Sequence, residues 1–208
     1  MGVALGLQCS VARKLTSSDV CLACHRVSKP SDVRCVGVAV YFLPIKTRMP
    51  IKFGPETLSS VTCARVQMRV QSRDGRTAEG WGETPLSVQW GWPSTLAYEP
   101  RHAAMKELCL ALGKAWVANA QFGNPVEIGS EFEDEVLPNL LNSANQFSTV
   151  GEAMPWLAAL ICASAFDIAL HDAYGNLLHR PTYETYGPEH LNRTLEEFLT
   201  PADKAVSF

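Results

Sequence analysis

The residues best suited to chemistry lie in a cysteine-rich run near the amino terminus. Cys21, Cys24 and His25 form a Cys-x-x-Cys-His sequence, the pattern in which two thiols attach haem c and the histidine ligates its iron. The same side chains could contribute to a zinc site with Cys9 or Cys35. Haem attachment requires export, for which we see no signal, and no second Cys/His pair stands at zinc-finger spacing. We therefore favour a tail with incidental thiols, while the haem and zinc interpretations stay open.

A second pair of chemically useful residues lies four positions apart in an apolar run. Asp167 and His171 would share one face of a helix, which would suit a metal pair or an acid–base pair. Because the rest of this helix is apolar, we expect both residues to be structural, as we do for the neighbouring Asp172. Asn192-Arg193-Thr194 matches a glycosylation sequon only by pattern. The sequence has no glycine-rich phosphate loop and no Gly-x-Ser-x-Gly motif.

The overall composition is that of a globular protein. The chain has 208 residues, a net charge of -3 and 47% hydrophobic residues. These values exclude a disordered polyampholyte, a collagen-like repeat and a coiled coil, and they predict no nucleic-acid or membrane partner. No run reaches about 18 apolar residues, so we expect no membrane span, and a cytoplasmic location is the default. Seven cysteines do not predict a disulfide scaffold; we expect buried free thiols at Cys63, Cys109 and Cys162.

The first half of the chain predicts a sheet. Residues 1–33 show no sustained periodicity and indicate a disordered, cysteine-containing extension. Residues 36–43 alternate as a strand, and prolines bracket a loop over 44–55. Further strands are expected over 64–70 and 77–83, joined at Asp74-Gly75, a strong hairpin signal. The pattern predicts a three-stranded antiparallel meander.

The second half predicts helices. A long loop over 85–100 leads to a helix over 101–118, with apolar residues at 3.6-residue spacing. A weaker helix is expected over 131–142, with Phe132, Val136 and Leu140 as its apolar stripe. Residues 156–178 are apolar almost all round, which is typical of a helix inside a bundle. Strands followed by helices indicate the α+β class.

Three segments in order resemble a known family. A strand runs into a segment over 44–54, the Asp-Gly turn leads to Glu79-Gly80-Trp81-Gly82-Glu83, and Ala165-Phe166-Asp167-Ile168-Ala169-Leu170-His171-Asp172-Ala173-Tyr174-Gly175 precedes Arg180-Pro181. Over residues 34–187 the chain resembles the N-terminal capping domain of the enolase superfamily, in its mandelate racemase / muconate lactonizing enzyme branch. The resemblance implies an enolase-like N-terminal domain over 34–187, with a linker or the start of a barrel domain over 188–208.

The resemblance also implies a division of chemistry. In the family, a (β/α) barrel carries a Lys or His base and three carboxylates that hold Mg²⁺, and the base removes the proton α to a carboxylate. Such enzymes are racemases, dehydratases or cycloisomerases, and the cap closes over the barrel mouth. A barrel needs about 200–250 residues, whereas 21 residues follow Gly187. We therefore expect no catalytic and no magnesium-binding residue in this chain, which would be inactive alone.

Two loops of the cap would face the substrate by this resemblance. The first contributes Met49, Phe53 and Gly54, and the second contributes Trp90 and Trp92. The expected partners are the barrel domain and a small carboxylate substrate. Because an isolated cap would expose apolar surface, we also expect a homo-oligomer. The alternatives are a non-enzymatic cap-like binding or interaction module, and a small metal- or haem-binding protein that uses Cys21, Cys24 and His25.

Overall fold

A computed structural model describes residues 28–53, 56–119 and 121–199, apart from the side chains of Phe53 and Glu56. The Cys21, Cys24 and His25 cluster and Gly54 lie outside the described residues. The haem, zinc and tail interpretations of that cluster therefore stay predictions.

A three-stranded antiparallel sheet forms the first half of the domain, as predicted. Its strands are β1 (Val33–Phe53), β2 (Glu56–Ser72) and β3 (Thr77–Pro85), in the order β1-β2-β3. The prediction of a loop over 44–55 is wrong for most of these residues. Strand β1 continues through them and pairs with β2 as far as Phe53. The ladder is irregular between Lys46 and Ile51, around Pro50, which has no N–H to donate to a ladder.

The two faces of the sheet differ as the alternation predicts. On β2, Ala64, Val66, Met68 and Val70 are buried on the inner face. The outer face carries cross-strand ion pairs at 2.6 Å, Arg65 with Glu83 and Arg69 with Glu79. These pairs are exposed and contribute little to stability. The apolar face is the one that the helices cover.

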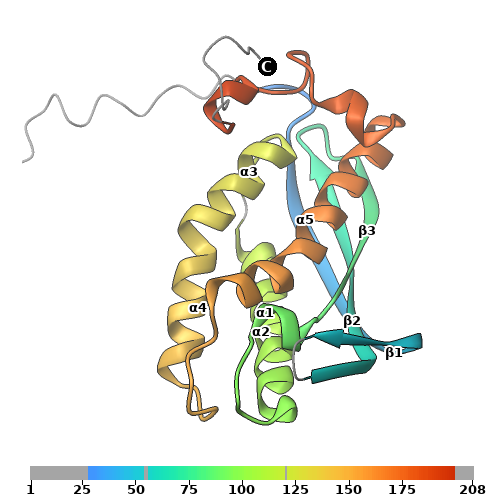
Figure 1. Cartoon of the computed structure of the whole chain (residues 1–208). Coiled ribbons are helices and arrows are strands. Elements are labelled where there is room, and N and C mark those ends of the chain that lie inside the picture. Colours follow the sequence, from blue (N-terminus) through green and yellow to red (C-terminus); the bar gives the residue numbers. More distant parts are fainter. Residues whose placement is uncertain (1–27, 54–55, 120, 200–208) are drawn as a thin grey trace, which may run out of the picture.

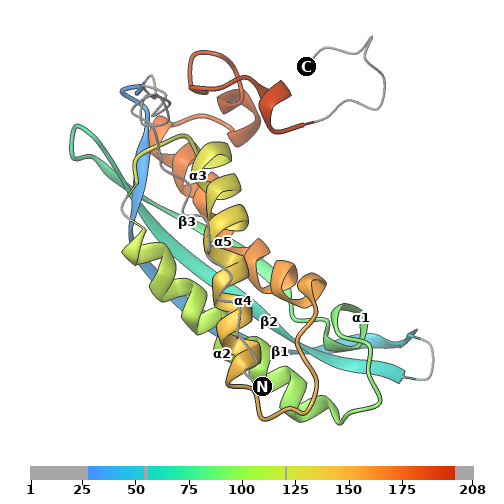
Figure 2. The ribbon, with the colours of Figure 1, turned by 90° about the vertical axis from the view of Figure 1, so that its left-hand side faces the viewer.

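The helices form two further layers. In the layer next to the sheet, α2 (Tyr98–Ala118) packs on β1, and α5 (Trp156–Leu178) packs on β2 and β3. A short helix, α1 (Val88–Gly91), precedes α2. Figures 1 and 2 show α3 and α4 along α2 and α5, on the side away from the sheet. The strands-then-helices order confirms the predicted α+β class.

The weaker helix is longer and less regular than predicted. It runs as α3 (Pro125–Glu131), a π-helical turn η1 (Phe132–Val136) and α4 (Leu137–Gln146). The π turn adds one residue to a helical turn. The buried positions are therefore Ile128, Phe132, Leu137 and Leu141, and the expected stripe through Val136 and Leu140 shifts by one residue after Phe132.

Two glycines let α5 lie directly on β3. A Cβ atom on Gly80 would come within 2.0 Å of the Ala173 backbone nitrogen, and one on Gly82 within 2.0 Å of the Ala165 carbonyl oxygen. Helix α5 thus lies against the sheet rather than inside a bundle, and residues such as Ile168 stay exposed. Its length and hydropathy are those of a membrane span, but its buried face packs on the sheet as a core helix does.

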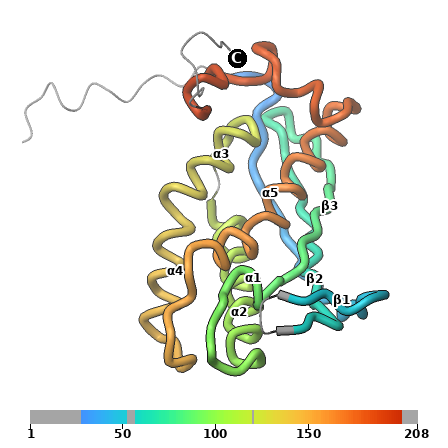
Figure 3. The backbone as a smooth tube through the Cα atoms, viewed as in Figure 1, coloured from blue at the N-terminus to red at the C-terminus, as the bar shows by residue number. Residues whose placement is uncertain are grey.

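The two ends of the described chain meet. After α5 come two 3-10 turns, η2 (Thr182–Thr185) and η3 (Leu195–Glu197). Figure 3 shows this segment passing the start of β1, and Asn192 donates a hydrogen bond of 3.0 Å to the buried Asp32. Asp32 and Val33 are therefore buried, whereas the sequence predicts a disordered extension over residues 1–33.

Candidate functional site

The two predicted lid segments lie at the same end of the sheet. β3 ends opposite Cys63, while β1 and β2 continue as a two-stranded ribbon up to the pair of Phe53 with Glu56. The chain leaves β3 beside the base of this ribbon, where the Leu86 N–H donates to the Thr62 carbonyl at 2.8 Å. Helix α1 follows at once, so the ribbon and α1 stand next to each other (Figure 1).

The ribbon presents apolar and cationic side chains together. Met49 is 70% exposed, and Ile45 and Ile51 are also exposed. Among the described side chains of β1 in this ribbon, Lys46, Arg48 and Lys52 are exposed and positively charged, a combination that suits a small organic anion.

Helix α1 exposes one tryptophan and buries the other. Trp90 is 54% exposed, whereas Trp92 is 1% exposed. Gly91, between them, faces the Ile161 side chain of α5, so α1 lies tightly on the body of the domain. The structure therefore leaves the side chain of Trp90 exposed, and its lid role stays a prediction, whereas the side chain of Trp92 lies in the core.

A buried arginine holds the segment after α1. Arg101 is 1% exposed and donates to the carbonyl oxygens of Trp92, Leu96 and Ala97, the latter two at 2.9 Å and 3.2 Å. These charge-assisted hydrogen bonds satisfy three carbonyls of an irregular segment. Sequence reasoning missed Arg101, because an arginine in the first turn of a helix gives no signal that it is buried.

At the tip of the ribbon, the structure describes the backbone of Phe53 but not its side chain. Phe53 ends β1, so the chain carries it to the tip of the ribbon. Its contact with substrate, and that of Gly54, stay predictions.

Asp167 and His171 are brought together on α5, but the contact is loose. His171 Nε2 lies 3.7 Å from Asp167 Oδ1, and His171 Nδ1 lies 3.2 Å from the Tyr186 hydroxyl. Burial lowers the pKa of His171 below its ordinary value of 6.5, although Asp167 raises it. The imidazole therefore joins α5 to the turn at Tyr186 in its neutral form, as a structural residue would.

The pKa of His171 predicts how stability depends on pH. Because the pKa is lower in the folded state, the unfolded state takes up the proton first as pH falls below 6.5, and the free energy of unfolding decreases. His171→Gln should remove the contribution of His171 to the pH dependence of the free energy of unfolding, which is at most about 1.4 kcal/mol per pH unit. Urea titrations between pH 5 and pH 8, values around the ordinary histidine pKa, would measure it. Tyr186→Phe keeps the imidazole and should keep the slope; an unchanged slope in His171→Gln would contradict the assignment.

Asp172 also has a structural partner. Its Oδ2 accepts the Trp81 backbone N–H of β3 at 2.8 Å and the Asn176 amide at 3.3 Å. Asn176 also donates to the Glu79 carbonyl at 2.9 Å. These contacts satisfy backbone groups on an edge strand that would otherwise be open to pairing.

The described residues do not fit a magnesium site. Among them, no group of three or more His, Cys, Asp or Glu side chains comes together. The two most deeply buried carboxylates, Asp32 and Glu127, accept hydrogen bonds from backbone and amide groups instead. We therefore assign no metal-dependent step to this part of the chain.

Comparison with known proteins finds similarity only among solved structures. No protein-family model and no curated protein sequence matches the chain. A dipeptide epimerase from Enterococcus faecalis is 19% identical with a TM-score of 0.43, and the match covers 74% of this chain and 35% of the epimerase. The L-Ala-D/L-Glu epimerase from Bacillus subtilis is 15% identical with a TM-score of 0.41, covering 74% and 34%. A mandelate racemase/muconate lactonizing protein from Herpetosiphon aurantiacus is 13% identical with a TM-score of 0.40, covering 77% and 36%.

The similarity of the chain to these solved proteins is one of fold alone. The chain spans about a third of the length of these solved proteins. Structural matches with such low identities and TM-scores do not support a functional assignment. The functional proposal therefore depends on the residues of this chain.

Proposed function

We propose that this chain is the substrate-capping part of a Mg²⁺-dependent enzyme that removes the proton α to a carboxylate. The observation that carries the proposal is that the two segments predicted to form a lid lie at the same end of the sheet. There, the ribbon carries the exposed Met49 together with Lys46 and Arg48, and the neighbouring helix α1 carries the exposed Trp90. Apolar side chains exclude water from a closed site, and cations attract the carboxylate.

The reacting groups belong, in this proposal, to a barrel domain that lies outside the described residues. When bound there, Mg²⁺ stabilises the negative charge that develops on the substrate carboxylate. The capping residues would bind and orient the substrate and exclude water. The complete enzyme would be a racemase, dehydratase or cycloisomerase, cytoplasmic and homo-oligomeric, with no nucleic-acid partner.

Deuterium exchange tests the proposal. The native polypeptide, purified from the cell that produces it and measured by intact mass, should be near 40 kDa or above, the size of a cap plus a barrel of about 200–250 residues. With Mg²⁺ in D₂O it should exchange the α-proton of at least one member of a carboxylate panel, followed by proton NMR, and a chelator should stop the exchange. The 208-residue chain alone should exchange none. A native mass of 22.8 kDa without exchange would contradict the proposal.

A matched pair of variants tests the capping role. In the native polypeptide, Trp90→Ala should raise the KM by about 10-fold, because a lid contact mainly supplies binding, and should lower kcat less. Tyr183→Ala is the control, since Tyr183 is 87% exposed and lies on η2, after α5, away from the ribbon and α1. If Trp90→Ala and Tyr183→Ala had equal KM values, the proposed lid contact of Trp90 with the substrate would be contradicted.

A further inference from the structure

The outer face of the sheet carries two exposed aromatic side chains near its centre. Trp81 on β3 is 47% exposed and Tyr41 on β1 is 45% exposed, and their ring centroids lie 6.0 Å apart. The helices α2 and α5 cover the opposite face (Figure 1). An antiparallel sheet with one solvated face usually directs polar side chains outward. A tryptophan and a tyrosine together on that face therefore call for a physical explanation.

Charged side chains flank this aromatic pair in two rows across the sheet. Arg65 pairs with Glu83 in one row, and Arg69 pairs with Glu79 in the other, each at 2.6 Å. The strand register places both arginines on β2 and both glutamates directly opposite on β3, with Trp81 in the row between them. The four charges sum to zero, and they form a positive column beside a negative column.

This arrangement of charges is complementary to itself. A two-fold rotation about an axis parallel to the strands, between β2 and β3, would place β2 of one copy over β3 of a second copy. Each arginine would then face the glutamate of its own row in the other copy, and the ion pairs would join into alternating networks, which contribute more than isolated surface pairs. An axis perpendicular to the strands would instead place arginine over arginine, so the charges favour only the first arrangement.

The same rotation brings an exposed ring to a hollow. A depression of about 310 Å³ at the edge of β3 is lined by Arg65, Trp81, Gly82, Glu83 and, from α5, the exposed Ile168. Tyr41 lies opposite Arg65 on the side away from β3. The rotation would carry Tyr41 just past β3 of the second copy, to this depression. Tyrosine, tryptophan and arginine are also the residue types that most often dominate protein interfaces.

We propose that the outer face of the sheet binds the same face of a second copy of this chain, with the two-fold axis between β2 and β3. The face is only three strands wide, so we expect a weak dimer that forms at micromolar concentrations. This inference specifies the homo-oligomeric state of the proposed function, but it involves neither Mg²⁺ nor substrate. Its failure would therefore leave the deuterium-exchange result untouched.

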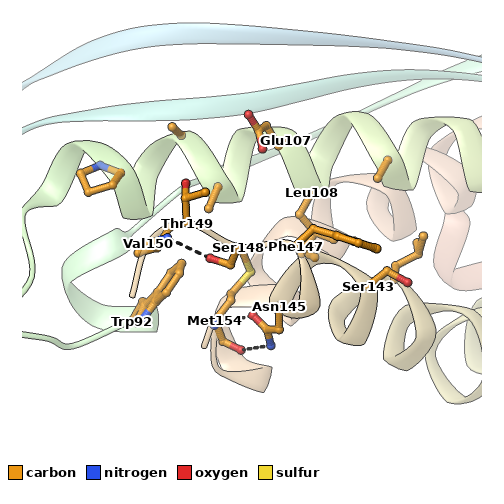
Figure 4. Close-up of a pocket in the computed structure, with 16 residues that line it drawn as sticks. Trp92, Glu107, Leu108, Ser143, Asn145, Phe147, Ser148, Thr149, Val150 and Met154 are labelled. Carbon is orange, nitrogen blue, oxygen red and sulfur yellow. Dashed lines mark hydrogen bonds between the residues drawn. The ribbon is translucent and has the colours of Figure 1, made fainter. Parts of the chain in front are cut away.

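Analytical ultracentrifugation of the 208-residue chain tests the interface. The mass should change with concentration from 22.8 kDa to twice that value. Trp81→Ala should raise the Kd of the dimer by about 10-fold or more, as expected of an aromatic side chain at the centre of an interface. Phe147→Ala is the matched control and should leave the Kd unchanged, because Phe147 is 79% exposed but follows α4, in the helical layers (Figure 4).

Exchanging the charges tests the pairing between copies. Arg65→Glu with Arg69→Glu makes all four charges negative, and Glu79→Arg with Glu83→Arg makes all four positive, so neither double variant should dimerise alone. The two variants mixed in equal amounts should associate, because opposite charges then meet again across the interface. The control is Lys114→Glu with Arg180→Glu, two exposed residues on α2 and after α5, which should dimerise as the unchanged chain does.

Circular dichroism of each variant would show that the fold is retained. A chain that stays monomeric at its highest soluble concentration would overturn the proposal. A dimer that persists unchanged in Trp81→Ala and in Arg65→Glu with Arg69→Glu would also overturn it, because that dimer would form through another surface. If both charge variants were monomeric alone and stayed monomeric when mixed, the pairing of charges between copies would be refuted.

Discussion

Replacing Gly82 with alanine should destabilise the domain by about 3 kcal/mol or more, the upper part of the range for overpacked cores, and Gly80→Ala should do the same. The added methyl groups would meet backbone atoms of α5 at 2.0 Å, at the Ala165 carbonyl oxygen and the Ala173 nitrogen. Backbone atoms cannot rotate away as a flexible side chain can, so the whole helix would have to move off β3. Urea unfolding followed by circular dichroism measures the loss.

Gly37→Ala is the matched control for these variants. Gly37 lies on β1 of the same sheet, and a Cβ atom there would be 3.7 Å from the Arg69 Cβ, an ordinary contact. Its urea midpoint should stay within the small range of surface substitutions, about 0.5 kcal/mol. If Gly82→Ala unfolded at the same urea concentration as Gly37→Ala, the close approach of α5 to β3 would be refuted.

This close approach gives the Gly80-Trp81-Gly82-Glu83 segment a physical explanation. Sequence reasoning identified the segment as a strand and as part of a family resemblance, but alternation alone does not say why every second residue is glycine. The reason lies on α5, where Ala165, Ala169 and Ala173 follow at four-residue spacing and meet the two glycines. Local patterns predicted both elements, whereas their pairing is a tertiary contact that neither pattern contains.

The errors of the sequence analysis have physical causes of the same kind. Prolines at 44 and 50 indicated a loop, but the ladder accommodates them in a ribbon that is irregular between Lys46 and Ile51. The π turn over Phe132–Val136 breaks the 3.6-residue period on which the predicted stripe depended. The sequence around Trp92 indicates an aromatic, glycine-bearing loop, whereas the structure buries the Trp92 side chain and joins its carbonyl to Arg101.

The buried carboxylate of Glu127 holds the C-terminal segment of the described chain, together with Asp32 and Lys29. Glu127, which is 4% exposed, accepts the backbone N–H groups of Asn192 and Arg193 at 2.6 Å and 3.0 Å. Its other oxygen accepts the Asn192 side-chain amide at 2.8 Å and the Asn124 N–H at 3.3 Å. The last of these contacts completes the capping box of α3. One side chain therefore joins a helix start to the segment that, in the proposed function, leads to the barrel.

Glu127→Ala should cost about 3 kcal/mol of stability, because several donors to one charged group lose their acceptor together. It should also release the segment over 188–199, which limited proteolysis or amide hydrogen exchange would detect as a region opened before global unfolding. Glu127→Gln keeps one oxygen for the Asn192 and Arg193 amides and should give an intermediate result.

Glu197→Ala is the control for Glu127→Ala, since Glu197 pairs with Arg193 on the exposed side of the same segment at 2.8 Å. It should leave the cleavage pattern unchanged. If Glu127→Ala and Glu197→Ala were cut at the same rate, the segment would be held by its remaining contacts. Glu127 would then matter only as the cap of α3, and the position of whatever follows the segment would have to be set elsewhere.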